Sequence, residues 1–198
     1  MARLKKKKVR DKIVASATKL FAKQGYFCTS VNQIAKNAEV AVGTIYVYFD
    51  SKDEILIELF IDYFRKLMEE IEEKFQNSKT EPLTKLLNGL RYMVNKLSED
   101  IDMAKVFLVE LRQSNKALNF IAPKIQKDYE KLIKKLLDEA KDQGLLNENI
   151  DTQVISISTF GLIETMLFDW LNRGYSKEKL IDNMEKTARY FVNGIRNI

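Results

Sequence analysis

Histidine is absent from this 198-residue sequence, and cysteine occurs only once, at Cys28. Without histidine there is no Ser-His or Cys-His nucleophilic arrangement and no histidine-ligated zinc site. A single cysteine excludes an internal disulfide and fits a reducing cytoplasm. The sequence also has no glycine-rich loop that could cradle a phosphate group. We therefore expect a cytoplasmic protein that is not an enzyme and that needs no cofactor or metal ion.

Residues that break helices are also few, with 7 glycines and 2 prolines. Long helices are the natural interpretation of such a chain, and the expected fold class is all-α. No run of 18 uncharged apolar residues occurs, and no apolar run follows the N-terminal lysines. We therefore expect neither a membrane-spanning segment nor a signal peptide.

Positive charge is concentrated at the N-terminal end. Residues 1–50 contain ten Lys and Arg against three acidic residues, whereas the remaining residues contain 23 basic and 25 acidic side chains. A basic end on a nearly neutral body is typical of a protein that binds nucleic acid through that end. The lysine run Lys5–Lys8 is then expected to act as an arm that contacts phosphates, although such a run can also be a solubilising tail.

The stretch Ser30–Lys52 predicts two short helices joined by a tight turn. Ser30 and Gln33 have the spacing of a capping box, which starts a helix at Val31. Residues 38–41 leave room only for a turn, and a second helix follows over Val42–Phe49. Two short helices with small and phenolic side chains on the second predict a helix-turn-helix that reads DNA.

The same stretch resembles the DNA-binding signature of the TetR family of bacterial repressors. The matching residues occur in order and without gaps: Thr29, Ile34, Ala35, Ala38, Val40, Gly43, Thr44, Ile45, Tyr46, Tyr48, Phe49 and Lys52. The sequence departs from the family pattern at Glu39, where glycine is commoner, and at Ala41, where a capping serine is usual. The alanine is expected to cost about 1 kcal/mol of local stability.

The resemblance implies a DNA-binding surface with two kinds of contact. Tyr46, Tyr48 and Lys52 are expected to contact phosphates. The short or amide side chains are expected to approach the bases. The full set is Ser30, Asn32, Gln33, Val42, Gly43, Thr44, Tyr46, Tyr48 and Lys52. The alternative for Tyr46 is a simple core position.

The rest of the chain predicts a larger helical body. A helix over about residues 10–24 completes a three-helix head, and a long helix from Ser51 to Phe75 leaves it. Further helices are expected from Pro82, over 103–115, 123–143 and 153–172, and after Gly174, about nine in all. We therefore predict a DNA-binding domain over residues 1–52 and a C-terminal bundle over 53–198 for ligand binding and dimerisation.

The helix over 153–172 is apolar on most sides, which predicts burial on two sides. In the resembled family the last two helices form a four-helix homodimer interface, and two-fold symmetry would present two recognition helices to operator DNA.

The middle helices of that family enclose an effector pocket. The apolar candidates here are Phe60, Phe64, Met93, Phe107, Leu111, Phe160 and Leu167. Three polar residues lie in otherwise apolar helices, namely Arg112, Asn115 and Glu164. The alternatives are that the apolar residues are ordinary core and that Arg112 and Glu164 form a structural pair.

The body resembles one branch of the family, the acyl-CoA-responsive repressors of fatty-acid degradation. The similarity rests on GTIYVYFDSKDEIL (residues 43–56), ELRQSN (110–115) and the IET…W pattern of residues 163–165 and 170. It implies a repressor of fatty-acid degradation genes that long-chain acyl-CoA releases from its operator, with the long helix from Ser51 coupling the two sites.

Two other interpretations of the sequence stay open. A multidrug-efflux repressor would share the head and bind cationic or aromatic drugs. A nonspecific architectural DNA-binding protein would spread basic residues over its body, which this sequence does not do.

Overall fold

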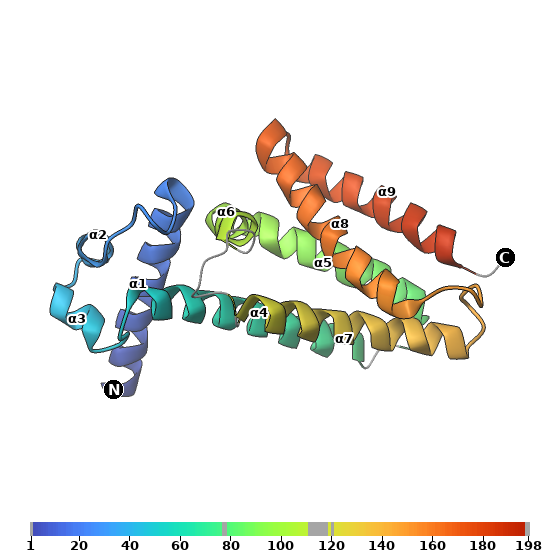
Figure 1. Cartoon of the computed structure of the whole chain (residues 1–198), viewed down its shortest axis with the longest axis horizontal. Helices are drawn as coiled ribbons and strands as arrows, with labels where there is room; N and C mark the ends of the chain where they lie inside the picture. The colour runs from blue at the N-terminus through green and yellow to red at the C-terminus, as the bar shows by residue number, and fades with distance from the viewer. Residues whose placement is uncertain (1, 77–78, 111–118, 120, 197–198) are drawn as a thin grey trace. The chain divides into compact units, whose positions relative to one another are not determined.

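The computed structural model describes residues 2–76, 79–110, 119 and 121–196. Within this part the chain forms nine α-helices and no β-strand, which confirms the all-α prediction (Figure 1). Their bounds are α1 Ala2–Gln24, α2 Val31–Asn37, α3 Val42–Tyr46, α4 Lys52–Gln76, α5 Pro82–Glu99, α6 Ile101–Glu110, α7 Ile121–Asp142, α8 Thr152–Arg173 and α9 Lys177–Ile195.

The chain divides into two compact units. The first comprises Met1–Phe64 and Asp100–Ala122, and the second comprises Arg65–Glu99 and Pro123–Ile198. The first unit therefore holds the three helices of the head together with the beginning of α4 and the whole of α6. A division of function at residue 52 stays a prediction.

The head is built around one apolar cluster. Gly25, at φ 80°, ends α1, and Ser30 and Gln33 form the expected capping box at the start of α2. Apolar side chains from α1, α2, α3 and the segment before α4 are almost fully buried: Ile13, Ala17, Phe21, Ile34, Ala35, Ile45 and Phe49. Their burial holds α2 against α1 and α3 against α2.

Two helix ends in the head differ from the prediction. The first helix begins at Ala2 rather than near Arg10, so the run Lys5–Lys8 belongs to α1 and is not a separate arm. Lysine is a good helix former, and nothing in this stretch breaks the helix. The second difference is that α3 ends at Tyr46, because Val47 and Tyr48 form turn-like hydrogen bonds to Thr44 and Ile45.

The turn between α2 and α3 uses a non-glycine residue in the left-handed conformation. Glu39 has φ 52°, at the position where glycine is commoner in the resembled family. Its Oε2 accepts a hydrogen bond from Lys12 Nζ of α1 at 2.7 Å, which lowers the pKa of the Glu39 carboxyl. Ala41 caps α3 without any side-chain hydrogen bond, as its identity predicts.

The second unit packs α5 against α8 and α9. Asp151 caps α8, and Gly174 ends it in the left-handed conformation at φ 64°. Between α7 and α8, the buried Tyr129 hydroxyl donates to Thr159 Oγ1 at 2.8 Å, and Thr159 donates in turn to the Ser156 carbonyl. Burial raises the pKa of Tyr129, so the phenol stays neutral and can donate.

The helix α8 buries one face only. Ser156, Thr159, Ile163, Leu167 and Trp170 are buried, whereas Val154, Ile157 and Phe168 are about half exposed. Burial on two sides, expected from the sequence, is thus not met within one chain, because α5, α7 and α9 cover a single face. Among the described helices, α8 alone is long and apolar enough to cross a membrane by length and composition, and 28% of that stretch is buried.

Substitution of Glu39 tests the turn. Glu39→Gly is expected to raise the melting temperature by roughly 2–4 °C, because it removes the steric cost of a left-handed side chain. Glu39→Ala is the matched control, since it also loses the Lys12 contact but keeps the strain. Thermal unfolding followed by circular dichroism measures both, and equal melting temperatures for the two variants would contradict the assignment of strain to this turn.

Candidate nucleic-acid interface

The outer face of α3 and the residues after it present the predicted recognition surface. Val42, Gly43 and Tyr46 are exposed, and Thr44 and Tyr48 are half-buried. Ile45 and Phe49 point inward and are 1% and 2% exposed, which fixes the rotation of the helix. Tyr46 is 54% exposed, so the alternative that it is a core residue is wrong. Exposed hydroxyl groups beside short side chains suit close approach to a DNA groove and its phosphates.

The predicted contacts on α2 lie at its beginning and are also exposed. Ser30 and Gln33 close the capping box: Gln33 N–H donates to Ser30 Oγ at 3.2 Å, and Ser30 N–H donates to Gln33 Oε1 at 2.8 Å. Gln24 Nε2 donates to the same Gln33 oxygen at 3.3 Å. Ser30 and Gln33 therefore hold the helix start, and Asn32 between them is exposed.

Lys52 lies differently from a simple phosphate ligand. Its Nζ donates to the carbonyl oxygens of Tyr26 and Thr29, both at 2.7 Å, and lies 4.0 Å from the centre of the Tyr26 ring. An ammonium group has three donors, so one is left for a phosphate. Lys52 thus ties the start of α4 to the loop before α2, a role that the sequence pattern did not predict.

Part of the basic charge of the head is neutralised by ion pairs within the chain. Arg10 pairs with Glu58 and with Asp62, 3.0 Å away, and its guanidinium lies over the Phe49 ring. Lys12 pairs with Glu39. Lys6, Lys7 and Lys8 are exposed on the first turns of α1.

The aromatic candidates for effector binding in the first unit form one buried row. The rings of Phe60 and Phe64 are stacked with centres 6.2 Å apart, and Phe64 lies 5.2 Å from Phe107 of α6. All three side chains are at most 6% exposed. The structure brings these three predicted residues together.

The candidates in the second unit lie on α5 and α8. Met93 and Leu167 are buried, and Phe160 and Glu164 are half-buried, with Phe160 edge-on to Tyr129 at 5.4 Å. Leu111, Arg112 and Asn115 lie outside the described residues, so pairing of Arg112 with Glu164 stays a prediction. A pocket shared by all these side chains also stays a prediction.

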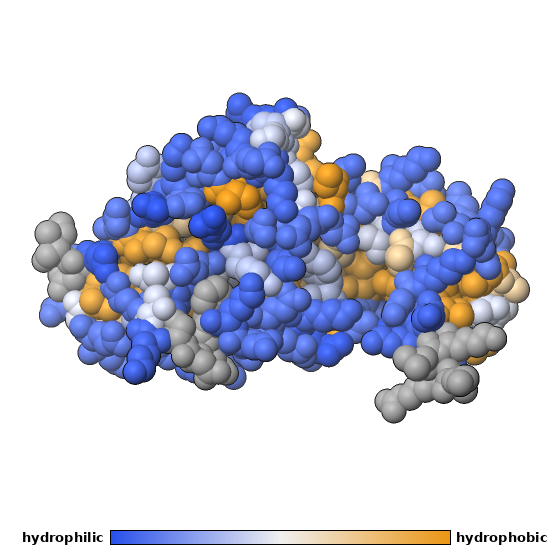
Figure 2. Space-filling model, turned by 180° about the vertical axis from the view of Figure 1, so that it is seen from behind, coloured by the Kyte–Doolittle hydropathy of each residue, from blue (hydrophilic) through white to orange (hydrophobic). Residues whose placement is uncertain are grey.

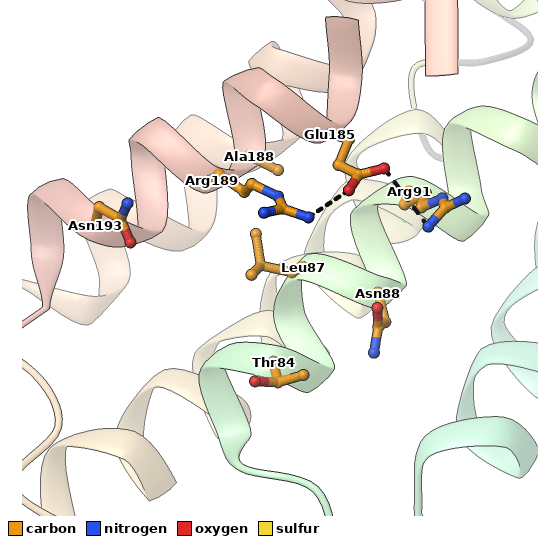
Figure 3. Close-up of a pocket in the computed structure, with 8 residues that line it drawn as sticks. All are labelled: Thr84, Leu87, Asn88, Arg91, Glu185, Ala188, Arg189 and Asn193. Carbon is orange, nitrogen blue, oxygen red and sulfur yellow. Dashed lines mark hydrogen bonds and ion pairs between the residues drawn. The ribbon is translucent and has the colours of Figure 1, made fainter. Parts of the chain in front are cut away.

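A pocket of about 320 Å³ lies within the second unit, between α5 and α9 (Figure 3). Glu185 lies between two arginines at its rim, with Arg189 2.6 Å and Arg91 3.6 Å away. None of the predicted effector residues lines this pocket, which is formed by Thr84, Leu87, Asn88, Arg91, Glu185, Ala188, Arg189 and Asn193. Its charged rim does not suit a long acyl chain.

A further residue was missed by the sequence analysis. Glu110, at the end of α6, is 1% exposed, and its Oε1 accepts a hydrogen bond from the backbone N–H of Tyr26 at 3.1 Å. The available signal was an acidic residue that ends the apolar run VFLVE. The predicted effector contacts were instead Arg112 and Asn115, which follow Glu110 in the motif ELRQSN.

Comparisons with known proteins agree with this geometry. Residues 13–59 match the family model of bacterial regulatory proteins, tetR family, and residues 60–194 match that of the YsiA-like protein C-terminal region. A fatty acid metabolism regulator protein of Bacillus subtilis is 32% identical over 93% of this chain and 94% of its own length.

Two solved structures extend the similarity to the whole fold. The fatty acid degradation regulator FadR from Bacillus halodurans has a TM-score of 0.87 at 29% identity, covering 96% of this chain and 97% of its own. FadR from Bacillus subtilis in complex with stearoyl-CoA has a TM-score of 0.85 at 31% identity, with 93% and 98% covered. Because family models match residues 13–59 and 60–194 and the Bacillus subtilis regulator matches most of the sequence, the chain belongs to the TetR family of bacterial transcriptional regulators.

Proposed function

We propose that this protein is a homodimeric repressor of fatty-acid degradation genes that leaves its operator when it binds long-chain acyl-CoA. The observation that carries the proposal is the similarity, over more than nine-tenths of the chain, to regulators named for fatty-acid metabolism, one of them bound to stearoyl-CoA. The protein acts in the cytoplasm by binding alone and performs no catalysis.

Operator binding uses the exposed face of α2 and α3. The Tyr46 hydroxyl is free to reach a phosphate, and the small residues Val42 and Gly43 let the start of α3 seat deeply in the major groove. Asn32, exposed beside this helix, offers an amide that can pair with a base edge. Lys52 contributes through the loop that it ties, with one donor left for DNA.

Effector binding uses the apolar side chains of the middle helices. The row of Phe60, Phe64 and Phe107 supplies the kind of surface that an acyl chain needs. The alternative of an efflux repressor predicts carboxylates facing a cationic drug, and Glu164 is the half-buried candidate for that role.

Dimerisation uses α8 and α9. Val154, Ile157 and Phe168 recur at helical spacing along the uncovered face of α8, and Tyr190 of α9 is 75% exposed. Exposed apolar stripes of this kind mark contact surfaces. The largely hydrophilic surface of the molecule is interrupted by apolar areas (Figure 2). A second copy of the same two helices would cover the α8 stripe with matching apolar side chains.

The division between phosphate and base contacts can be tested by two substitutions. Tyr46→Phe removes one phosphate donor and is expected to weaken binding to all DNA sequences about equally, by roughly fivefold to tenfold. Asn32→Ala is expected to relax base preference at one operator position. Selection of operators from a random duplex library by wild type and both variants measures this, and an unchanged preference for Asn32→Ala would refute its base-reading role.

The lysines at the start of α1 are tested by salt dependence. Lys6, Lys7 and Lys8 together should add between two and three units to the slope of log affinity against log salt, since each neutralised phosphate contributes about 0.9. Substituting all three by Gln keeps the helix and removes the charge. Anisotropy titrations over a range of salt concentrations give the slope, and an unchanged slope would show that these lysines do not touch DNA.

The effector is tested by chain length. Acyl-CoAs of increasing length are titrated against the operator-bound dimer, and release is expected to peak at a long chain. Phe107→Trp should move that optimum toward shorter chains, because a larger buried side chain shortens the space available. If aromatic cations release DNA and no acyl-CoA does, the efflux-repressor alternative replaces this proposal.

A further inference from the structure

The loop Gly25–Thr29 sets where the helix-turn-helix lies, because α2 begins two residues after it. Two side-chain contacts give the loop its shape. Thr29 Oγ1 donates to the Gly25 carbonyl at 2.8 Å, and Gln24 Nε2 donates to the Cys28 carbonyl at 2.8 Å. The loop is thus an ordered connection, and a shift of it would carry the start of α2 along.

Tyr26 anchors this loop through nearly all of its polar groups. Its N–H donates to Glu110 of α6, its carbonyl accepts from Lys52 of α4, and its hydroxyl donates to Asp53. The ring lies under the Lys52 ammonium and against Phe21, and the residue is 5% exposed. Two helices that come from distant parts of the sequence therefore hold the backbone of the same residue.

The hydrogen bond to Glu110 is made in a low-dielectric setting. Burial lowers the pKa of Lys52, and the charge of Glu110 opposes that effect, so the two groups lie close enough to interact. Hydrogen bonds that involve an ionised acceptor are strong but depend steeply on distance and angle. A small movement of α6 is therefore enough to release the Tyr26 amide.

The same helix carries a predicted effector residue. Phe107 precedes Glu110 by three positions, so both lie on one side of α6, and Phe107 contacts Phe64. The helix also packs against α1 of the head. A shift of α6 that moves Phe107 also moves Glu110, because the two residues lie within one turn of the helix.

From these contacts we propose that Glu110 is a positioning residue for operator binding, and that its hydrogen bond to Tyr26 is the link through which α6 reports effector binding to the helix-turn-helix. The second part rests on the proposed function. The first part does not, because it concerns only how the free protein holds its DNA-binding end.

The test compares two substitutions of Glu110. Glu110→Leu removes the acceptor at similar volume and is expected to weaken operator binding about tenfold or more, while Glu110→Gln keeps an acceptor and should restore most of the affinity. Asp102→Asn, at the other end of α6, is the matched control and should bind as wild type. Affinity for an operator selected from random duplexes is measured by anisotropy, at a temperature where circular dichroism shows every variant fully folded.

The link itself is followed by hydrogen exchange at the Tyr26 amide. Stearoyl-CoA should speed exchange there in the wild type, whereas Glu110→Leu should exchange fast with or without it and lose most of the effector-induced release. Operator affinity of folded Glu110→Leu equal to wild type would overturn the positioning role. Unchanged Tyr26 protection in a dimer that stearoyl-CoA has released would overturn the reporting role.

Failure of the proposed function gives a different pattern. If stearoyl-CoA does not release wild-type protein from the operator, the effector assignment fails and the reporting role falls with it. The affinities of Glu110→Leu and Glu110→Gln without any effector still decide whether Glu110 positions the head.

Discussion

The backbone of Tyr26 is the point on which the arrangement of the DNA-binding end depends. Its N–H is held by α6, and its carbonyl is held by the first residue of α4. Neither contact is local, and the Glu110 side chain is 1% exposed, in a position where a group left without a partner is costly. The helix-turn-helix therefore does not stand alone on its small apolar core. Its position depends on the loop Gly25–Thr29, which α6 and α4 hold through Tyr26.

Local rules account for most of the helix boundaries. The capping box of Ser30 and Gln33 lies where the spacing predicts it, and Gly25, Gly144 and Gly174 all have positive φ. These signals act over a few residues, so a single sequence contains them in full. The errors occurred where a local signal was weak. Nothing in Lys5–Lys8 either forbids or requires a helix, and the chain continues α1 through it.

Long-range polar contacts could not be predicted in the same way. Arg10 counts in the sequence as one of the ten basic residues of the N-terminal end, yet it pairs with Glu58 and Asp62 of α4. Lys52 matches a family signature as a phosphate ligand, yet two of its donors bind loop carbonyls. The sequence does not show which opposite charge a side chain pairs with, because pairing across tens of residues produces no periodic pattern. The recognition surface was easier, since exposure of Gly43 and Tyr46 follows from the inward position of Ile45.

The free energy of the hydrogen bond between Tyr26 and Glu110 bears on how effector binding can release the protein from DNA. An effector can shift DNA binding only by the difference in its affinity for the two states of the head, which in allosteric proteins is typically about 1–3 kcal/mol. A hydrogen bond to a charged group contributes about 1.5–3 kcal/mol to a folded structure. The two ranges overlap, so breaking one such bond has the magnitude that a release mechanism needs. The apolar contacts of Ile13, Phe21 and Ile34 are far larger in sum and would remain. Because the apolar core of the head does not depend on the Glu110 contact, the head can change position without unfolding when that contact breaks.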